Sequence, residues 1–213
     1  MKIYADPITV NCRKVLAGLD LLGAPYELMH VDYFKAEQKS AAYVAINPNQ
    51  SLPALVDGDF VLWESNAILQ YAADKVGAES AYPRDLKVRA DINRWLLWES
   101  SSWFPSCYVF LVENCVKPLL GSQADPAVLA AQAEQFHKLA GILDARLAGQ
   151  RWVTGNTPTI ADIALAAPMH LHQYQQLPLQ GFPHLQRWLT ERVEKLPSWH
   201  NTYVGPGFTL TRP

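Results

Sequence analysis

The chain has 213 residues, 49% of them hydrophobic, which is enough for one large domain or two small domains with a buried core. A net charge of −2 and a charged fraction of 18% argue against a nucleic-acid-binding surface or an acidic tail, so the expected partner is a small molecule or another protein. Three cysteines without a CxxC pair favour a reducing compartment. Neither a signal run nor a stretch of about 18 apolar residues is found, so we expect a soluble cytoplasmic protein.

Strand and helix patterns alternate through the first third of the chain. A helical pattern over 11–22 is closed by Gly23, and a later helix has to end before Pro48, because the residue before a proline disfavours helical backbone. In chain order we expect a strand over 2–5, the helix over 11–22, a strand over 26–31, a helix over 36–46, hairpin strands over 54–56 and 60–63, and a helix over 65–76. The order βαβαββα is typical of a thioredoxin-like α/β domain, in which helices cover a mixed sheet.

From about residue 82 the pattern is almost wholly helical, which predicts an all-α helical-bundle domain. Pro105 falls inside a long helical stretch and is expected to kink or split it. Thr159 and Asp162 have the spacing of a capping box that opens a further helix. Helices are expected over 86–120, 126–147 and 182–196. We therefore expect a first domain over 1–77, a linker over 78–87 and a helical domain over 88–213.

The most informative segment is 51–58 (SLPALVDG), followed shortly by Glu64 and Ser65. Pro53 lies at the start of a buried strand, where it has no N–H to donate to the hydrogen bonds of a central strand. One reason for a proline there is a cis peptide bond that presents the backbone of Leu52 to a ligand. Ser65 opens a helix whose first amide donors are a ready site for a carboxylate. Together these features resemble the glutathione site of the cytosolic glutathione transferases. The resemblance covers essentially the whole chain and implies a bacterial member of the serine/threonine type.

The resemblance implies that glutathione is bound as a co-substrate and that its thiolate is favoured. A free thiol has a pKa of about 8.5, and lowering it by about two units requires roughly 2.7 kcal/mol of selective stabilisation. One hydroxyl or amide donor supplies about 1.5–3 kcal/mol, so neither a metal nor a general-base triad is required. The resemblance gives this role to Thr9, where serine-type members have serine, and to Asn11, whose amide can share it or take it over. The alternative for Thr9 is a simple helix cap.

The Thr-x-Asn pattern leaves the reaction open. Some bacterial members that resemble this pattern work as disulfide reductases on glutathionylated substrates and have weak transferase activity. Cys12 adds a second alternative, because residues 9–12 occupy the place of the thioredoxin CxxC, with threonine instead of the leading cysteine. A lone cysteine one turn into a helix is more often a small buried hydrophobe, which is the interpretation we favour.

The resemblance also assigns residues that bind the two ends of the tripeptide. At the γ-glutamyl end, Glu64 takes the ammonium group and Ser65 takes the carboxylate, although Glu-Ser alone is also an ordinary helix start. Leu52, before the cis Pro53, offers its backbone N–H and C=O to the cysteinyl unit.

The glycyl carboxylate is assigned to Gln38 and Lys39, and Ser51 is expected to reach the peptide. Lys39 has the alternative of a solvated surface lysine, and Lys35 is a weaker rival for the same role. Gln50 departs from a glycine that is common in this loop, so the local backbone shape is left open.

The electrophile pocket is expected on the first long helix of the second domain. This helix carries an aromatic stripe, and we expect most of its residues to form core or dimer contacts, as such stripes usually do. The residues predicted to line the pocket are Trp98, Ser102 and Tyr108. His170 and His172 lie two residues apart on a helix and face different ways, without a carboxylate or cysteine cluster, so no metal site is expected.

The leading interpretation is a homodimeric, cytoplasmic glutathione S-transferase of detoxification that adds the glutathione thiolate to small hydrophobic electrophiles. The first alternative is a glutathione-dependent disulfide reductase or peroxidase that uses the same site. The others are a non-catalytic regulatory binding protein of the same fold and a specialised isomerase or dehalogenase. The identity of the electrophile is not predicted.

Overall fold

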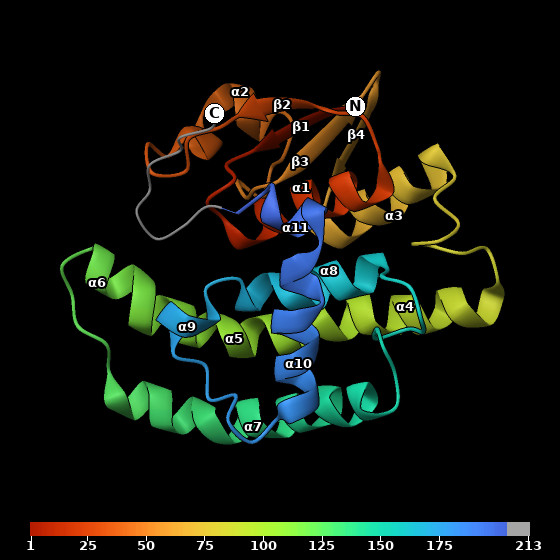
Figure 1. The fold of residues 1–213 in the computed structure, drawn as a ribbon. Helices are drawn as coiled ribbons and strands as arrows, with labels where there is room; N and C mark the ends of the chain where they lie inside the picture. Colours follow the sequence, from red (N-terminus) through yellow and green to blue (C-terminus); the bar gives the residue numbers. More distant parts are fainter. Residues whose placement is uncertain (204–213) are drawn as a thin grey trace. The chain divides into compact units, whose positions relative to one another are not determined.

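A computed structural model describes residues 1–203 of the protein and contains two compact units (Figure 1). The sheet unit consists of Met1–Pro83 together with the segment that begins at Pro197, and the helical unit consists of Arg84–Leu196. Among the described residues, no helix is both long enough and apolar enough to cross a membrane.

The sheet unit is built on four strands in the order β2-β1-β3-β4. The strands are β1 (Lys2–Ala5), β2 (Glu27–His30), β3 (Ala54–Asp57) and β4 (Phe60–Trp63). β1 pairs in parallel with β2 and antiparallel with β3, and β3 pairs antiparallel with β4. Two helices, α1 (Val10–Leu22) and α3 (Ser65–Val76), pack against each other beside the sheet (Figure 1). This mixed sheet with helices confirms the predicted thioredoxin-like arrangement.

The helix expected over 36–46 is instead two short pieces. A 3₁₀ helix covers Glu37–Lys39, and α2 covers Ala41–Val44. Ser40 between them has extended backbone (φ −64°, ψ 148°), and its hydroxyl accepts a hydrogen bond from the Tyr43 N–H. A serine that caps a new helix in this way ends the preceding turn, which the apolar periodicity alone does not reveal.

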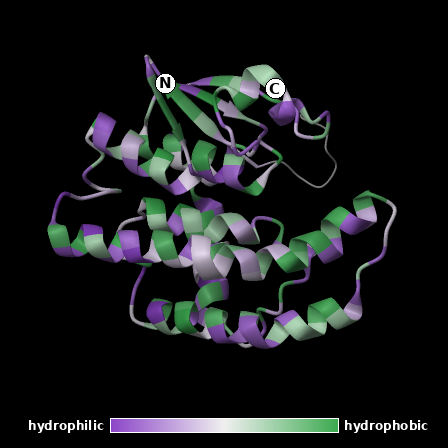
Figure 2. Ribbon diagram, turned by 180° about the vertical axis from the view of Figure 1, so that it is seen from behind, coloured by the Kyte–Doolittle hydropathy of each residue, from purple (hydrophilic) through white to green (hydrophobic). Residues whose placement is uncertain are grey.

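Gly18 marks a close approach of α1 to α3. A Cβ atom at this position would lie 2.3 Å from Cδ2 of Leu69, and Leu69 is itself fully buried, so its side chain has little room to move. The surrounding core is apolar, and the strands of the sheet are mostly hydrophobic in Figure 2. Fully buried members of this core are Ile3, Leu16, Leu19, Leu55 and Ile68.

We expect Gly18→Ala to lower the free energy of unfolding by about 1–3 kcal/mol, because overpacking outweighs the gain of up to about 1 kcal/mol in helix propensity. Gly141 is the matched control, since a Cβ there would meet only the Phe182 ring at 3.8 Å, an ordinary contact distance. Gly141→Ala should therefore stabilise the protein by about 0.5–1 kcal/mol. Urea unfolding of both variants checks this, and equal effects would contradict the close helix contact at Gly18.

The helical unit confirms the predicted all-α character of the second part of the chain. Its α-helices are α4 (Leu86–Trp98), α5 (Phe104–Leu111), α6 (Lys117–Leu119), α7 (Pro126–Ala148), α8 (Ile160–Ala166), α9 (His172–Gln175) and α10 (Pro183–Glu191). α7 packs against α5 and α10 (Figure 1), and hydrophobic and hydrophilic residues alternate along it in Figure 2. The capping box predicted at Thr159 and Asp162 opens α8.

The predicted split at Pro105 is not found. The chain stays helical through this region, but it changes to π-helical geometry over Glu99–Trp103 before α5 begins. Pro105 then lies in the first turn of α5, where a missing N–H is tolerated. A π-helical segment rearranges the backbone hydrogen bonds ahead of the proline, and this adjustment is not visible in the sequence pattern.

The C-terminal segment differs from the expected division, which placed 88–213 in one helical domain. The helix expected over 182–196 ends at Glu191, and the following α11 (Pro197–His200) belongs to the sheet unit. Arg13 on α1 holds it there: the guanidinium lies 4.2 Å from the centre of the Trp199 ring, and Nη2 donates to the Trp199 carbonyl at 3.3 Å. Arg13 is only 1% exposed, so this stacking is part of the interior of the sheet unit.

Candidate functional site

The loop between β1 and α1 positions the two residues predicted to act on the thiol. Buried Asp6 fixes the loop by accepting hydrogen bonds from the N–H groups of Ile8 (3.2 Å) and Tyr33 (2.9 Å). Thr9 stands at the N-cap position of α1, but its side chain makes no capping hydrogen bond. Its hydroxyl instead donates to the Asp6 carbonyl at 3.2 Å. Thr9 is therefore no side-chain cap, and its hydroxyl proton already has a partner within the loop.

Asn11 lies at the start of α1 and faces the start of α3. The Ser65 hydroxyl donates to Asn11 Oδ1 at 3.5 Å, and the buried Lys14 ammonium donates to Ser65 Oγ at 3.1 Å. Within residues 1–203 the amide nitrogen of Asn11 has no hydrogen-bond partner, which leaves an amide donor available to a ligand. The packing of α1 against α3 thus joins two residues predicted for different parts of glutathione, the thiol and the γ-glutamyl carboxylate.

Glu64 precedes α3 with backbone angles of φ 75° and ψ 112°, which a residue with a side chain rarely adopts. It occupies the N-cap position without making a side-chain capping hydrogen bond, so it is not an ordinary cap. Its side chain is exposed, and within the described residues its carboxylate has no hydrogen bond or ion pair. Strained backbone of this kind is concentrated at binding and catalytic sites, where it directs a side chain at a ligand.

The peptide bond between Leu52 and Pro53 is cis, as predicted. The N–H and C=O of Leu52 have no hydrogen-bond partner within residues 1–203, although Leu52 itself is largely buried. The preceding Ser51 carbonyl is held by the Tyr43 hydroxyl at 2.6 Å and by Asn47 Nδ2 at 2.8 Å. Burial raises the pKa of Tyr43, so its hydroxyl stays protonated and continues to donate.

Gln50 adopts a φ of 56° in this loop. This is the left-handed region that glycine adopts without strain and that a residue with a side chain adopts less often.

The residues predicted for the glycyl carboxylate differ in exposure. Lys39 is exposed, whereas Gln38 is only 5% exposed, so the Gln38 side chain presents little surface to a ligand. Lys35, the rival to Lys39, already pairs with Asp32 at 3.0 Å. Exposure and pairing thus favour Lys39 among the three.

Cys12 is completely buried, and burial raises the pKa of its thiol to about 12. A thiol with this pKa is protonated at physiological pH and is a poor nucleophile. The structure therefore favours the small buried hydrophobe over the redox residue.

We expect Cys12 to resist alkylation by iodoacetamide at pH 8 in the folded protein, because so little thiolate forms and the sulfur is covered. Cys115, which is partly exposed, should react first. Peptide mass spectrometry measures the order, and unfolding in urea provides the control in which every cysteine reacts. Modification of Cys12 ahead of Cys115 would restore the redox interpretation.

The residues predicted for the electrophile pocket lie in the helical unit with different exposures. Trp98 is half-buried and stacks on the fully buried Trp103 at 5.8 Å between ring centres, so it belongs largely to the core. Ser102 is half-buried, and Tyr108 is 40% exposed with Phe104 stacked on it. Among these three residues, Tyr108 is therefore the most exposed to a ligand.

The histidines make separate contacts. His170 Nδ1 lies 3.0 Å from the Ala167 carbonyl, and His172 Nε2 lies 3.2 Å from Glu194 Oε1, so the two rings do face different ways. Over residues 1–203, no group of three or more His, Cys, Asp or Glu side chains is arranged to hold a metal ion.

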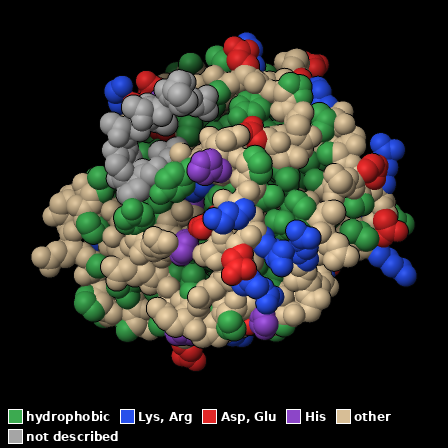
Figure 3. Space-filling model, viewed as in Figure 1, with side chains coloured by type: hydrophobic (Ala, Val, Ile, Leu, Met, Phe, Trp, Pro, Cys, Tyr) green, Lys and Arg blue, Asp and Glu red, His purple; other side chains and the backbone are tan. Residues whose placement is uncertain are grey.

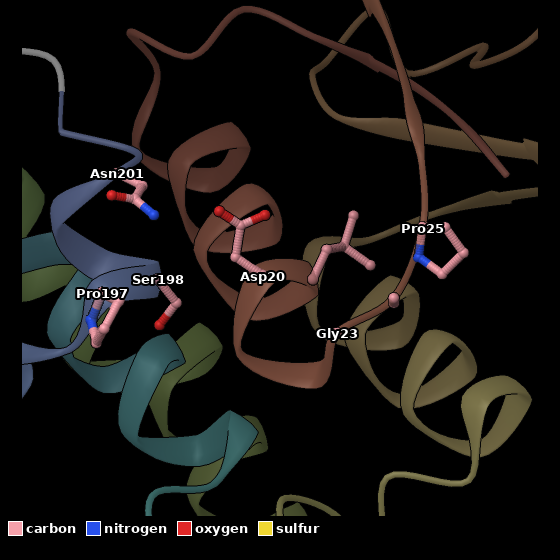
Figure 4. Close-up of a pocket in the computed structure, with 8 residues that line it drawn as sticks. Asp20, Gly23, Pro25, Pro197, Ser198 and Asn201 are labelled. Atoms are coloured by element: carbon pink, nitrogen blue, oxygen red, sulfur yellow. The ribbon is translucent and has the colours of Figure 1, made fainter.

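A shallow hollow in the sheet unit, about 340 Å³ in volume, lies between the end of α1 and α11 (Figure 4). Its lining includes Asp20, Gly23, Pro25, Ser198 and Asn201. None of these is a predicted site residue, so the hollow is not the expected glutathione site.

Comparison with known proteins identifies the family. The family model for the glutathione S-transferase N-terminal domain matches residues 2–74, and that for the C-terminal domain matches residues 126–191. A rice protein (Oryza sativa subsp. japonica) named probable glutathione S-transferase GSTF2 is 31% identical over 203 residues, which is 92% of each chain. The chain belongs to the glutathione S-transferase family.

Further members of the glutathione S-transferase family match over almost the whole chain. Glutathione S-transferase 3 of Zea mays is 32% identical over 208 residues, which is 95% of this chain and 92% of that protein. The structure of glutathione S-transferase I from maize, in complex with an atrazine glutathione conjugate, has a TM-score of 0.84 at 27% identity and covers 94% of this chain and 95% of its own. Other relatives come from a fly and a mouse, so the bacterial serine/threonine-type subclass stays a prediction.

Several residues that contact the candidate site were not predicted from the sequence. Tyr43 and Asn47 fix the Ser51 carbonyl, and Lys14 reaches Ser65 from α1. The only sequence signal for Lys14 is its spacing, since it follows Asn11 by three residues and so shares its helix face. A lysine on such a face is expected at the surface, and only the packing of α3 reveals that it is buried.

Proposed function

We propose that this family member is an active glutathione S-transferase, which binds glutathione in its sheet unit and stabilises the thiolate for attack on small hydrophobic electrophiles. The observation that carries the proposal is the meeting of Asn11 and Ser65, whose Oδ1 and Oγ atoms lie 3.5 Å apart, with the Asn11 amide nitrogen left unpaired within residues 1–203. One donor for the thiolate and one for a carboxylate are thus close together. The maize structure, which holds a glutathione conjugate, supports the choice of ligand.

At the γ-glutamyl end, Glu64 binds the ammonium group, and the Ser65 hydroxyl and backbone N–H bind the carboxylate. The carboxylate of Glu64, which is exposed and has no partner within residues 1–203, supports the first assignment. The amide groups at the start of α3 support the second, because an anion is stabilised at a helix N-terminus. The ammonium group is then met by a carboxylate, and the carboxylate on the same carbon atom is met by hydrogen-bond donors at a helix N-terminus.

The middle and the glycyl end of glutathione are assigned to the loop and the 3₁₀ helix. The N–H and C=O of Leu52, next to Pro53, have no partner within residues 1–203. They form hydrogen bonds with the cysteinyl backbone of glutathione, as neighbouring strands do. Lys39 binds the glycyl carboxylate, and Gln38 and Ser51 complete this end of the site.

The thiolate is assigned chiefly to Asn11, with Thr9 beside it. The Asn11 amide is an open donor, whereas the Thr9 hydroxyl has to leave the Asp6 carbonyl before it can serve a ligand. The electrophile is assigned to Ser102, Tyr108 and Trp98 of the helical unit. The sulfur attacks the electrophilic carbon, the new S–C bond forms, and the leaving group departs with its electron pair.

The protein is also proposed to be a cytoplasmic homodimer that serves in detoxification. The edge strand β4 supports a dimer, because it exposes large apolar side chains: Phe60, Val61 and Trp63 are each 41–43% exposed. On the face shown in Figure 3, lysine and arginine side chains lie among aspartate and glutamate side chains, which supports a small-molecule partner rather than a nucleic acid.

Glutathione-dependent disulfide reduction is the second candidate. The observation that favours it is the Thr9–Asp6 hydrogen bond, which leaves the Asn11 amide as the donor unpaired within residues 1–203, in a Thr-x-Asn pattern that resembles that of some disulfide-reducing family members. A regulatory, non-catalytic protein is less favoured, because Asn11, Glu64 and Leu52 have groups that are unpaired within residues 1–203 and so are available to a ligand.

Calorimetry with reduced and oxidised glutathione tests the proposal, with wild type beside Glu64→Ala. We expect wild type to bind reduced glutathione tightly. Glu64→Ala should weaken this binding about 10-fold or more, since hydrogen bonds to charged groups contribute about 1.5–3 kcal/mol. Preference for the oxidised form would favour disulfide reduction. If the protein binds neither form, the proposed enzymatic function is wrong and a partner-binding function is favoured.

A further inference from the structure

Lys14 is a buried lysine that the glutathione assignment leaves without a role. It lies on α1 three residues after Asn11, and it is only 2% exposed. Its ammonium group donates to Ser65 Oγ at 3.1 Å and to Asn66 Oδ1 at 3.4 Å. Both acceptors stand in the first turn of α3, the place proposed for the γ-glutamyl carboxylate. A buried cation is favoured beside an anion, and this one lies at the site where an anion is expected to bind.

We propose that Lys14 is a positioning residue for glutathione, which orients the Ser65 hydroxyl toward the γ-glutamyl carboxylate and supplies positive charge behind it. The inference rests on the proposed function. It concerns the chain of contacts from Asn66 through Lys14 and Ser65 to Asn11, which lies behind the carboxylate site and is formed by this protein's own side chains.

The first step of the argument is the direction of the Ser65 proton. A lysine ammonium group can only donate, so the Ser65 oxygen has to accept the hydrogen bond from Lys14. The Ser65 proton must therefore point away from Lys14, and it is directed at Asn11 Oδ1 at the long distance of 3.5 Å. A carboxylate is a stronger acceptor than an amide oxygen, so a bound carboxylate takes this proton. Lys14 in this way makes Ser65 an obligatory donor.

The second step is charge. Glu64 and Lys14 carry opposite charges, and both lie next to the start of α3, Glu64 exposed in front of it and Lys14 buried on α1. The γ-glutamyl end of glutathione carries an ammonium and a carboxylate on one carbon atom. Glu64 matches the first charge and Lys14 the second, so the pair selects ligands that carry both. A ligand without the carboxylate gains nothing from Lys14.

The test is a cycle of two ligands and matched variants, read by calorimetry. The ligands are glutathione and its analogue γ-aminobutyryl-cysteinylglycine, which lacks only the γ-glutamyl carboxylate. Lys14→Met replaces the ammonium with an apolar chain of similar length. It should weaken glutathione binding about 10- to 100-fold and binding of the analogue less than about 3-fold. Lys14→Arg should restore glutathione binding to within about 5-fold of wild type, and the exposed Lys2→Met is the control with the same loss of charge.

Each outcome separates the inference from the function it rests on. If wild type does not bind glutathione, the proposed function is wrong. If wild type binds and Lys14→Met loses both ligands equally, or neither, Lys14 is merely structural and the inference is wrong. Should Lys14→Met fail to fold, the nitrogen resonance of Lys14 in the wild-type protein decides. It should shift when glutathione is added and stay in place with the analogue, and equal shifts would overturn the inference.

Discussion

Asn11→Ala is expected to lower kcat/KM for transfer of glutathione to a soft aryl electrophile by about 10- to 100-fold, which corresponds to the loss of one donor to a charged sulfur, about 1.5–3 kcal/mol. The reason is the side-chain amide of Asn11 at the start of α1, whose nitrogen has no hydrogen-bond partner within residues 1–203. Because the donor stabilises the thiolate, its removal should also move the pH–rate profile toward higher pH. Initial rates over a pH series measure both effects.

Thr9→Val is the matched comparison for Asn11→Ala, since it keeps the branched shape and removes only the hydroxyl. The Thr9 hydroxyl already donates to the Asp6 carbonyl at 3.2 Å, so we expect a smaller loss than for Asn11→Ala. If Thr9→Val abolishes transfer while Asn11→Ala retains it, the order of the two roles is reversed. Binding of glutathione by both variants shows that any loss of rate belongs to the chemistry.

Asp162→Ala is expected to have the largest effect on stability, a loss of about 3–5 kcal/mol in the free energy of unfolding of the helical unit. The carboxylate is fully buried and accepts from the N–H groups of Val153 and Thr159, both at 2.9 Å, and from the Trp188 indole at 3.0 Å. Burial raises the pKa of Asp162, and these hydrogen bonds act in the opposite direction. Alanine would leave the three donors buried without an acceptor.

Asp85→Ala is the control for this substitution. Asp85 is also a helix cap, accepting from the N–H groups of Lys87 and Val88 at 3.0 Å, but it is exposed, so water replaces the lost acceptor. Its removal should reduce stability by only about 1 kcal/mol. Urea unfolding of the two variants under the same conditions measures the difference. Equal losses would contradict the structural role assigned to the Asp162 cluster.

Local signals were sufficient to predict much of the fold. The order of strands and helices follows from periodicity and from glycine and proline positions, and the capping box at Asp162 follows from the spacing of two residues. The cis bond at Pro53 was one candidate reason for a proline at that position, and the family resemblance also implied it. The predictions that failed concern places where nearby residues change the backbone. Ser40 ends a turn by capping the next helix, and π-helical backbone ahead of Pro105 removes the need for a break. Neither choice is encoded in apolar spacing.

The site divides in the same way. Thr9, Asn11 and Ser65 were assigned through the family resemblance, and each stands at the start of a helix that the sequence also predicts. Lys14 could not be predicted, because a lysine is normally solvated, and its burial depends on the packing of α3 over α1. Arg13 is a similar case: its stacking on Trp199 joins residues 186 positions apart, which no local pattern can indicate.

The central claim is that the protein binds glutathione and lowers the pKa of its thiol. The ultraviolet absorbance of the thiolate, followed while the complex of wild-type protein and glutathione is titrated with base, tests this most directly. We predict an apparent pKa about two units below the free value of about 8.5. A thiol that titrates in the complex at its free value would contradict the account, even if glutathione binds.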